Sequence, residues 1–387
     1  MKKKDDSIAV IIQNYIQYLS IMPGIDELIK LGYNVDIYGE KLDNDEGFSE
    51  LLNDAIEMMR KKGYKVYTEP QDKTYKILLD VYDTPLNLKY KYRIKYRYGL
   101  ISSKPDRTLV PSNYLKYDCV ICAGPYDSKL IGNYTHTVVI PDMKYYKLKK
   151  KKHNTDKKVL LYVPTYGEGS SIELVLEQLA KLRKDYYVIA KLHHGTCFLY
   201  DEKERNKLIH KAVDECYDLH KELKDLFEIA DVVLSDNSSA LFEGIYNGIP
   251  TCACSEDLNQ NKLGDFNTFQ YTLYKDGILP YTNNPKNLKK IIEEAQSKEI
   301  YKKQQEWNNK TFDHTTDPIK AFVSLIDNYL NDNIDMESFM FHRFLFDAFK
   351  ELQNKNAELV AELNDYKKGK LYNVATKIYK IENKVKK

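Results

Sequence analysis

The feature that most constrains the fold is an alternation of short apolar segments with helical segments, which begins twice along the chain. The first series starts at residues 8–12, a run with β-branched side chains, and the second starts at 159–163. Strands that alternate with helices favour a parallel sheet with helices on both faces. Each half of the chain is therefore predicted to form an α/β structure of its own.

The expected elements follow from where apolar residues run together and where they recur at helical spacing. In the first half the pattern predicts helices that end near 31 and 62, and strands at 8–12, 35–38, 65–68, 76–81, 94–98, 119–123 and 137–140. In the second half it predicts strands at 159–163, 186–192, 232–235 and 251–255. Helices are expected there at 172–182, 240–247, 287–295 and 318–330, and 202–229 is expected to be mostly helical.

A polar, basic segment at 148–158 separates the two series of elements. Its sequence, Leu-Lys-Lys-Lys-Lys-His-Asn-Thr-Asp-Lys-Lys, is typical of a linker. A chain of 387 residues also exceeds what one hydrophobic core usually serves. We therefore expect domains at 1–147 and 159–331 and a helical tail at 336–387. A ligand cleft is expected between the two domains, at the carboxyl ends of their strands.

The composition excludes several classes of protein. Hydrophobic residues make up 43% of the chain and charged residues 30%, which favours a globular protein over a disordered one. The net charge is only +2, so no overall basic field indicates a nucleic-acid partner. No window approaches the roughly 18 apolar residues of a membrane span, and the start Met1-Lys-Lys-Lys-Asp-Asp is unlike a signal peptide. A cytoplasmic protein is expected.

The six cysteines do not predict a metal site. Cys119 and Cys122 lie three residues apart on one expected strand, so their side chains point to opposite faces. Cys252 and Cys254 share a face but have no second pair near them in the sequence. We expect buried free thiols in a reducing compartment, with neither a metal ion nor a cofactor.

The segment 230–250 carries the clearest chemical signal. An apolar strand ends at Asp236, and Asn237 or Ser238 is suited to cap the helix that follows. The N-terminus of that helix offers unpaired N–H groups and a partial positive charge beside the hydroxyls of Ser238 and Ser239. This arrangement suits a phosphate oxyanion. The alternative is an ordinary cap on an ordinary helix.

The same segment, Asp236-Asn-Ser-Ser, resembles the Asp-Tyr-Ser-Ser motif of the CDP-glycerol glycerophosphotransferase family, which makes teichoic acids and related polyol-phosphate polymers. Three further stretches resemble that family in the same order: Leu-Tyr-Val-Pro-Thr-Tyr at 161–166, Lys-Leu-His at 191–193 and Asp-Gly-Ile-Leu-Pro at 276–280. The resemblance covers about 156–330, and 1–150 only in layout. It implies an α/β fold of the GT-B type, in which two Rossmann-like domains face a cleft, with a C-terminal helical tail here.

The resemblance also implies roles for single residues. Ser238 and Ser239, with Asn237, are expected to bind the donor phosphates, and Asp236 to order the turn that carries them. His193 corresponds to a histidine that the family uses near the transferred phosphate, and imidazole can move a proton or stabilise phosphate charge near neutral pH. A histidine on a surface loop is the alternative, and His194 is the neighbour that could be confused with it. The residues expected to line the cleft from this half are Thr165, Tyr166 and Gly167.

One position departs from the family pattern. The family has His-Gly-Thr in its first domain, and that histidine is a leading candidate for the base. The corresponding stretch here reads Arg97-Tyr98-Gly99-Leu100, and Tyr98 and Gly99 are expected to line the cleft. Tyrosine, with a pKa near 10, is a poor base at neutral pH. The protein therefore uses another group, or has a different acceptor, or has lost catalysis.

The function that the resemblance implies is transfer of glycerol phosphate, or a similar polyol phosphate, from a CDP-activated donor to a cell-surface glycan or lipid-linked acceptor. Two alternatives stay open on the sequence. One is a GT-B glycosyltransferase that uses a nucleotide-sugar, because the same phosphate site at a helix end serves both. The other is a nucleotide-binding scaffold with weak catalysis, because the first-domain histidine is missing.

The tail has a pattern of its own. Large apolar residues between 341 and 366 step by four and three, with Asn356 at an a position, which favours a parallel two-stranded coil and hence a homodimer. A helix packed back on the first domain is the alternative. From 367 to 387 there are eight lysines and one acidic residue, Glu382, beside an apolar stripe. This pattern favours a helix on an anionic membrane surface, which would place the protein at the inner face of the cell membrane. A solvated charged end is the alternative.

Overall fold

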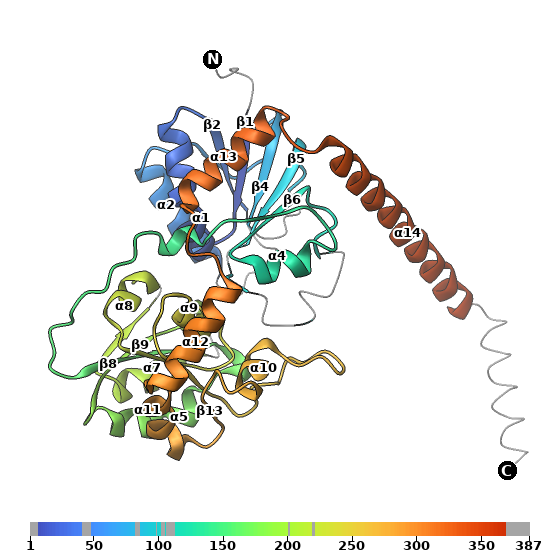
Figure 1. Ribbon diagram of the computed structural model, residues 1–387. Helices are drawn as coiled ribbons and strands as arrows, with labels where there is room; N and C mark the ends of the chain where they lie inside the picture. Colours follow the sequence, from blue (N-terminus) through green and yellow to red (C-terminus); the bar gives the residue numbers. More distant parts are fainter. Residues whose placement is uncertain are drawn as a thin grey trace, which may run out of the picture. The chain divides into compact units, whose positions relative to one another are not determined.

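The computed structural model describes residues 7–40, 48–81, 86–97, 99–101, 105, 113–199, 202–218 and 221–368. The chain divides into two compact units, 1–334 and 335–387. The first unit contains two parallel sheets with helices packed around each (Figure 1). The fold class predicted from the sequence, two Rossmann-like domains and a helical C-terminal region, is confirmed.

The first sheet has seven parallel strands in the order β3-β2-β1-β4-β5-β6-β7. The chain runs outward in one direction through β3 and then in the other from β4, so the order reverses between β1 and β4. The strands are β1 (Ser7–Ile12), β2 (Asn34–Gly39), β3 (Val66–Tyr67), β4 (Thr74–Asp80), β5 (Lys89–Tyr96), β6 (Cys119–Cys122) and β7 (Thr137–Val139). The helices of this half are α1 (Tyr15–Lys30), α2 (Phe48–Lys61), α4 (Pro125–Ile131) and the 3-10 turn η2 (Met143–Tyr145).

The second sheet has six parallel strands in the order β10-β9-β8-β11-β12-β13, which reverses between β8 and β11. The strands are β8 (Lys158–Val163), β9 (Tyr186–Lys191), β10 (Glu215–Tyr217), β11 (Val232–Ser235), β12 (Thr251–Cys254) and β13 (Tyr281–Thr282). The helices are η3 (Gly167–Gly169), α5 (Ile172–Leu182), α6 (His194–Phe198), α7 (Lys203–Ala212), α8 (Leu223–Ile229), α9 (Ala240–Tyr246), α10 (Phe269–Lys275), η5 (Pro285–Asn287), α11 (Leu288–Ala295), α12 (Lys298–Thr311) and α13 (Pro318–Leu330).

The central strands of the second sheet are buried on both faces, which explains their continuous apolar sequences. Leu161 and Val163 of β8 belong to one core cluster, and the alternate residues Leu160 and Tyr162 belong to the cluster on the other face. The first of these clusters also includes Leu100, Ala123 and Tyr145 from the first half. The two halves therefore share apolar packing.

The expectation that 202–229 is mostly helical is wrong in one part. Residues Glu215–Tyr217 form strand β10, which pairs with β9 at the edge of the second sheet. A strand of three residues shows too little alternation to stand out between the helical patterns of α7 and α8. The strand expected at 94–98 is β5, which begins earlier, at Lys89, and ends at Tyr96. Tyr98 lies outside the described residues.

Helix α13 returns to the first half, where it packs on α1 and β4. Gly24 of α1 permits a close approach, because a Cβ there would lie 2.6 Å from the Phe322 ring of α13. Tyr33 donates a hydrogen bond to Asp327, and Tyr329 packs edge-on against Tyr92 of β5. Helix α13 lies within the predicted domain 159–331, yet it packs with the first half. The domain boundaries themselves stay an interpretation.

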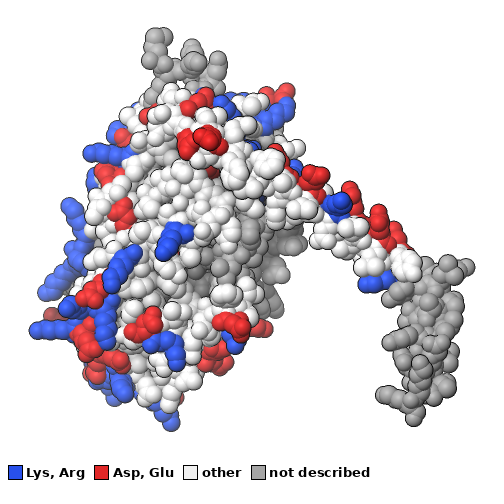
Figure 2. Space-filling view, turned by 45° about the vertical axis from the view of Figure 1, so that its right-hand side comes forward, with Lys and Arg blue, Asp and Glu red and all other residues white. Residues whose placement is uncertain are grey.

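Helix α14 (Met336–Lys368) forms the described part of the second unit and buries none of its described side chains. Figure 2 shows acidic side chains in a row along this helix, beside uncharged surface. In the described part of the chain, no helix has the length and apolar character needed to cross a membrane.

Candidate functional site

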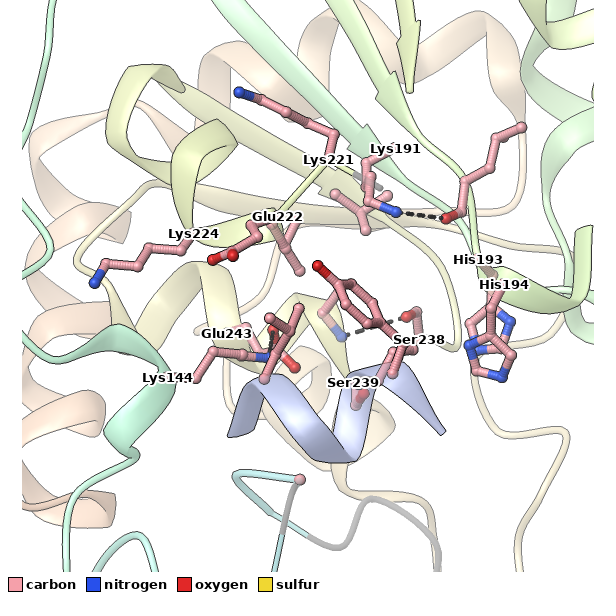
Figure 3. Close-up of a pocket in the computed structure, with 18 of the residues that line it drawn as sticks. Lys144, Lys191, His193, His194, Lys221, Glu222, Lys224, Ser238, Ser239 and Glu243 are labelled. Atoms are coloured by element: carbon pink, nitrogen blue, oxygen red, sulfur yellow. Dashed lines mark hydrogen bonds and ion pairs between the residues drawn. The ribbon is translucent and has the colours of Figure 1, made fainter. Parts of the chain in front are cut away.

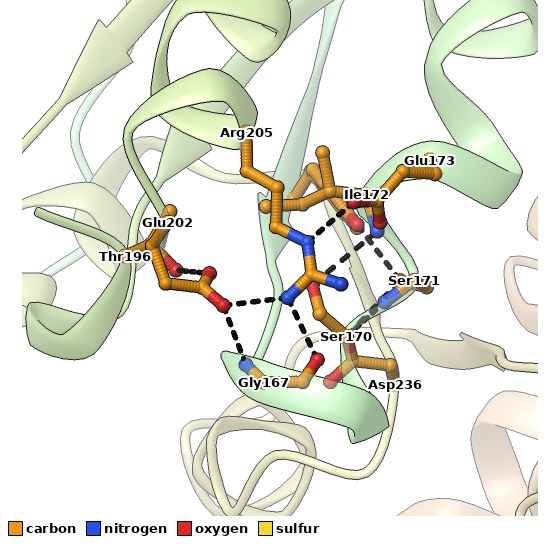
Figure 4. A network of polar contacts seen from close by, with 10 residues as sticks. Gly167, Ser170, Ser171, Ile172, Glu173, Thr196, Glu202, Arg205 and Asp236 are labelled. Carbon is orange, nitrogen blue, oxygen red and sulfur yellow. Dashed lines mark hydrogen bonds and ion pairs between the residues drawn. The ribbon is translucent and has the colours of Figure 1, made fainter. Parts of the chain in front are cut away.

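The turn after β11 is fastened to the loop after β8 by the carboxylate of Asp236. Oδ1 accepts hydrogen bonds from the Thr165 and Ser238 N–H groups at 2.8 and 3.1 Å. Oδ2 accepts from the N–H and the hydroxyl of Ser171, both at 3.0 Å, and Figure 4 shows Ser171 beside Asp236. The two loops follow adjacent strands at the point where the strand order reverses, which is where parallel α/β sheets bind ligands.

Asp236 is completely buried, and burial raises the pKa of its carboxyl to about 6, although its four hydrogen bonds act in the opposite direction. Both carboxylate oxygens are occupied by donors of the two loops. Asp236 therefore holds the turn in place through these hydrogen bonds.

The three residues after Asp236 have different surroundings. Ser238 is buried, and its hydroxyl accepts a hydrogen bond from the Ala240 N–H at 3.3 Å. Ser239 is the N-cap residue of α9, so the cap lies one or two residues later than expected, and its exposed hydroxyl makes no capping hydrogen bond. Asn237 donates its side-chain amide to the Asp257 carbonyl at 3.3 Å. Ser238 and Ser239 line the pocket described below, and Asn237 is not among its lining residues.

His193 follows β9 and is the N-cap residue of α6. Its Nδ1 accepts a hydrogen bond from the Gly195 N–H at 3.1 Å, so a neutral ring carries its proton on Nε2. Burial, with the nearby His194 and Lys191, holds the pKa of His193 well below its usual value. The ring is therefore a neutral hydrogen-bond donor through Nε2 at pH 7.

His194 and Tyr166 lie against His193. The two imidazole centroids are 3.9 Å apart, and the Tyr166 ring stacks on His193 at 4.5 Å. Burial, followed by the charge of Lys191, lowers the pKa of His194 to about 4. Neither imidazole is cationic near neutral pH in the free protein.

A pocket between the two halves brings these groups together (Figure 3). His193, His194, Ser238 and Ser239 line it from the second half, with Lys191 at the end of β9. The first half contributes an apolar wall and one cation, from Tyr15, Ile16, Leu19, Gly99 and Lys144. Glu222, Lys221 and Lys224 lie around α8, on the side of the pocket away from the histidines in Figure 3.

Two lysines of the pocket have shifted pKa values for different reasons. Burial lowers the pKa of the Lys191 ammonium to about 8, so part of the population is neutral in mildly alkaline solution. Burial also acts against the charge of Lys144, but the carboxylates of Glu243 and Asp142 raise its pKa above the usual value. The Lys144 Nζ lies 3.0 Å from Glu243 Oε2.

The loop at 165–167, which was expected to line the cleft, contacts residues of the site without lining the pocket. Gly167 has a φ of +68°, donates its N–H to Glu202 at 3.0 Å, and accepts from Arg205 at 2.8 Å (Figure 4). Thr165 is bound to Asp236, and Tyr166 contacts His193. None of these three is among the pocket's lining residues, whereas Gly99 is. Tyr98 cannot be placed, because it lies outside the described residues.

Sequence reasoning missed Tyr15, Lys144, Lys191, Glu222 and Glu243 as pocket residues. Lys191 lies inside a stretch that carries the family resemblance, and Glu243 lies four residues after another, so their position could have been noticed. The other three belong to no motif and come to the pocket only through folding. No group of His, Cys, Asp and Glu in the described residues could hold a metal ion.

Comparison with known proteins gives one family match. Residues 146–317 match the family of CDP-glycerol:poly(glycerophosphate) glycerophosphotransferases. The resemblance stated for about 156–330 is therefore confirmed. No curated protein matches the chain.

Several solved structures share the fold. The wall teichoic acid polymerase TagF, as a histidine-to-asparagine variant soaked with CDPG, is 16% identical with a TM-score of 0.52, over 86% of this chain and 89% of that chain. A Listeria monocytogenes protein assigned as a UDP-N-acetylglucosamine 2-epimerase is 12% identical with a TM-score of 0.55, over 86% and 98%. The glycosyltransferase of kitacinnamycin is 12% identical with a TM-score of 0.53, over 84% and 100%. These likenesses support the GT-B fold.

Proposed function

Because residues 146–317 match the family of CDP-glycerol:poly(glycerophosphate) glycerophosphotransferases, we propose that the protein transfers glycerol phosphate, or a similar polyol phosphate, from a CDP-activated donor. The acceptor is a hydroxyl of a cell-surface glycan or of a lipid-linked polymer. The proposed reaction uses neither a metal ion nor a cofactor bound by this chain.

The observation that carries the proposal is the set of donors that converge on one part of the pocket. Ser239, with its exposed hydroxyl, is the N-cap residue of α9. Lys191, with its ammonium, ends β9, and His193, with its Nε2–H, lies just after that strand. Hydroxyl, imidazole N–H and ammonium groups are all suited to phosphate oxygens. A pyrophosphate carries two negative charges, and the partial positive charge of the α9 N-terminus adds to the same field.

In the proposed reaction the acceptor oxygen forms a bond to the phosphorus of the glycerol phosphate. The bond from that phosphorus to the bridging oxygen breaks, and its electron pair leaves with CMP. Such transfers depend mainly on positioning and on charge stabilisation. His193 is proposed to donate its Nε2–H to a phosphate oxygen, and Lys191 to stabilise the negative charge that develops on CMP. His193 is not the base in this scheme, because its Nδ1 is occupied by the Gly195 N–H.

The C-terminal tail, 336–387, leads to two further proposals, a second copy of the chain and a membrane surface as partners. We propose that 341–366 pairs two copies of the chain, and that 367–387, most of which lies outside the described residues, binds an anionic membrane surface near a lipid-linked acceptor. Sedimentation with anionic vesicles at low salt tests the second part. Full-length protein should pellet, and protein truncated after Tyr366 should stay in the supernatant. The membrane proposal fails if both stay in the supernatant.

Donor binding tests the function itself. Isothermal titration of the full-length protein should show binding of CDP-glycerol and little response to UDP-sugars. Tight binding of a UDP-sugar without a response to CDP-glycerol would favour the nucleotide-sugar alternative. CMP release with an acceptor separates the enzyme from a scaffold that binds the donor without turnover.

A further inference from the structure

Two carboxylates line the pocket, and they differ in their partners. Glu243 of α9 accepts from the Lys144 ammonium at 3.0 Å and from the Tyr145 hydroxyl. Glu222 forms no hydrogen bond or ion pair with any of the residues that the structure describes. Glu222 is half-buried, so its carboxylate lines the pocket while its acceptor positions stay open to a ligand.

Glu222 lines the pocket and does not cap the helix that it precedes. Glu222 is the N-cap residue of α8, with φ −68° and ψ 134°, but its side chain makes no capping hydrogen bond. Its charge reaches the first half of the molecule. Burial and then Glu222 raise the pKa of Tyr15, and Glu222 adds to the larger effects of Glu243 and Asp142, which raise the pKa of Lys144 against its burial. Glu222 therefore faces the wall that the first half contributes.

The position of Glu222 also argues against contact with the donor phosphates. Figure 3 shows it on the opposite side of the two serines from His193 and His194. A carboxylate beside a pyrophosphate would repel it, whereas a carboxylate beside a hydroxyl accepts a hydrogen bond. The group that Glu222 suits is thus a hydroxyl on the side of the pocket nearest the first half.

Three other groups of the pocket, His193, Lys191 and Glu243, are less suited to take a proton from that hydroxyl. The Nδ1 of His193 accepts from Gly195, and its Nε2 carries the ring proton. Lys191 lies next to the histidines and donates to the Leu192 carbonyl at 3.3 Å. Glu243 is held by Lys144. Among the described residues, Glu222 is the pocket carboxylate that forms neither an ion pair nor a hydrogen bond.

We propose that Glu222 is the catalytic base that accepts the proton of the acceptor hydroxyl, in the role for which the first half has no His-Gly-Thr histidine at Tyr98-Gly99. The proposal rests on the proposed function. The proton moves from the acceptor oxygen to a Glu222 carboxylate oxygen as that oxygen bonds to phosphorus, and the electron pair of the broken bond leaves with CMP. A carboxylate base is sufficient for such a step, because phosphoryl transfer to a hydroxyl proceeds in kinases with an aspartate in this role.

The test uses full-length protein and three variants. Donor affinity is measured by titration with CDP-glycerol, and turnover by CMP release with a glycerol-phosphate oligomer that ends in a free hydroxyl. Glu222→Gln keeps the size of the side chain and removes the base, so we expect turnover to fall by about 10²-fold or more while the donor Kd changes less than about threefold. Added formate should restore at least part of the turnover of Glu222→Ala, because it can occupy the space of the lost carboxylate. Glu204→Gln on the exposed face of α7, where Glu204 pairs with Lys207, is the matched control.

The outcomes separate the two proposals. Turnover of Glu222→Gln within about threefold of wild type overturns the base, and so does a raised KM for the acceptor with unchanged kcat, which would indicate hydroxyl binding alone. Lost turnover without rescue by formate assigns Glu222 a structural role and also overturns it. A wild-type protein that binds CDP-glycerol but releases no CMP contradicts the base and leaves the donor site intact. If the wild type neither binds CDP-glycerol nor releases CMP, the proposed function itself fails.

Discussion

At the scale of single residues, two adjacent serines of the pocket are predicted to have different roles, one in donor binding and one in stability. The Ser239 hydroxyl is exposed and makes no capping bond, whereas Ser238 is buried and accepts from the Ala240 N–H. Ser239→Ala should therefore weaken CDP-glycerol binding by at least about tenfold with little change in stability, since a hydrogen bond to a charged group contributes about 1.5–3 kcal/mol. Ser238→Ala should lower the free energy of unfolding by about 1 kcal/mol. Titration and urea denaturation of both variants measure this, and equal effects on affinity would contradict the assignment.

The two nitrogens of His193 can be tested separately. In His193→Asn the side-chain oxygen can still accept from the Gly195 N–H, as Nδ1 does, but nothing replaces the Nε2–H. Turnover should fall by about 10²-fold, the scale for losing one donor to a developing charge, and the melting temperature should hardly change. His194→Asn is the control and should lose much less. Similar losses in both variants would remove His193 from its proposed role.

The pKa of Lys191 predicts how the affinity for the donor depends on pH. Its cation favours the anionic donor, and burial places its pKa at about 8, so the favourable charge is present below pH 8 and is lost as the pH rises through that value. The Kd for CDP-glycerol should rise above pH 8, by at most about tenfold per pH unit. Lys191→Arg keeps its charge throughout and should flatten the curve. Titration between pH 6.5 and 9.5 decides it, and a flat wild-type curve would exclude Lys191 from donor binding.

The residues of the second half were predictable because each follows an apolar strand. Asp236 and His193 come at or just after the ends of β11 and β9, and parallel strands bring such ends to one edge of a sheet. Tyr15, Lys144 and Glu222 were not predictable in the same way. They come from a helix face, a 3-10 turn and the start of α8, and they meet only because one half of the fold packs against the other.

At the scale of elements, the contact between the β8 and β11 loops depends on Asp236. Asp236→Asn replaces one acceptor oxygen by a donor amide, so at least one of the buried N–H groups of Thr165, Ser171 and Ser238 loses its partner. The free energy of unfolding should drop by about 2 kcal/mol, because an unsatisfied buried donor costs about 1–3 kcal/mol. Chemical denaturation measures this. Asp276→Asn, at an exposed position, should change stability by less than about 0.5 kcal/mol, and an equal loss there would contradict the role of Asp236.

The elements themselves were largely predictable because the central strands are buried on both faces and so appear as unbroken apolar runs. The strand β10 was missed since three residues at a sheet edge carry no clear period. The packing of α13 was also not predictable. Its amphipathic pattern shows that one face is buried, but its contact with Gly24 of α1 depends on the tertiary fold.

At the scale of the whole molecule, α14 predicts whether the protein is a monomer or a dimer. Its leucines at a and d positions form an apolar stripe along the helix, called the seam here. Leu345, Leu352, Leu359 and Leu363 are all exposed, and Leu352 is 67% exposed. Burying such a side chain contributes about 1.5–3 kcal/mol, so the seam favours association with a second copy. Asn356 lies at an a position between Leu352 and Leu359. It favours a parallel coiled coil of two helices, because two Asn side chains can form hydrogen bonds with each other there.

Light scattering of the full-length protein should therefore give twice the mass of one chain. Leu352→Asp combined with Leu359→Asp places charges in the seam and should give a monomer with unchanged affinity for CDP-glycerol. Asn354→Asp with Ala361→Asp adds the same charges at f positions, which face away from the seam, and should leave the dimer intact. Asn356→Leu should relax the preference for two strands and yield larger species. A monomeric wild type, or dissociation by both double variants alike, would mean that the seam does not pair two copies.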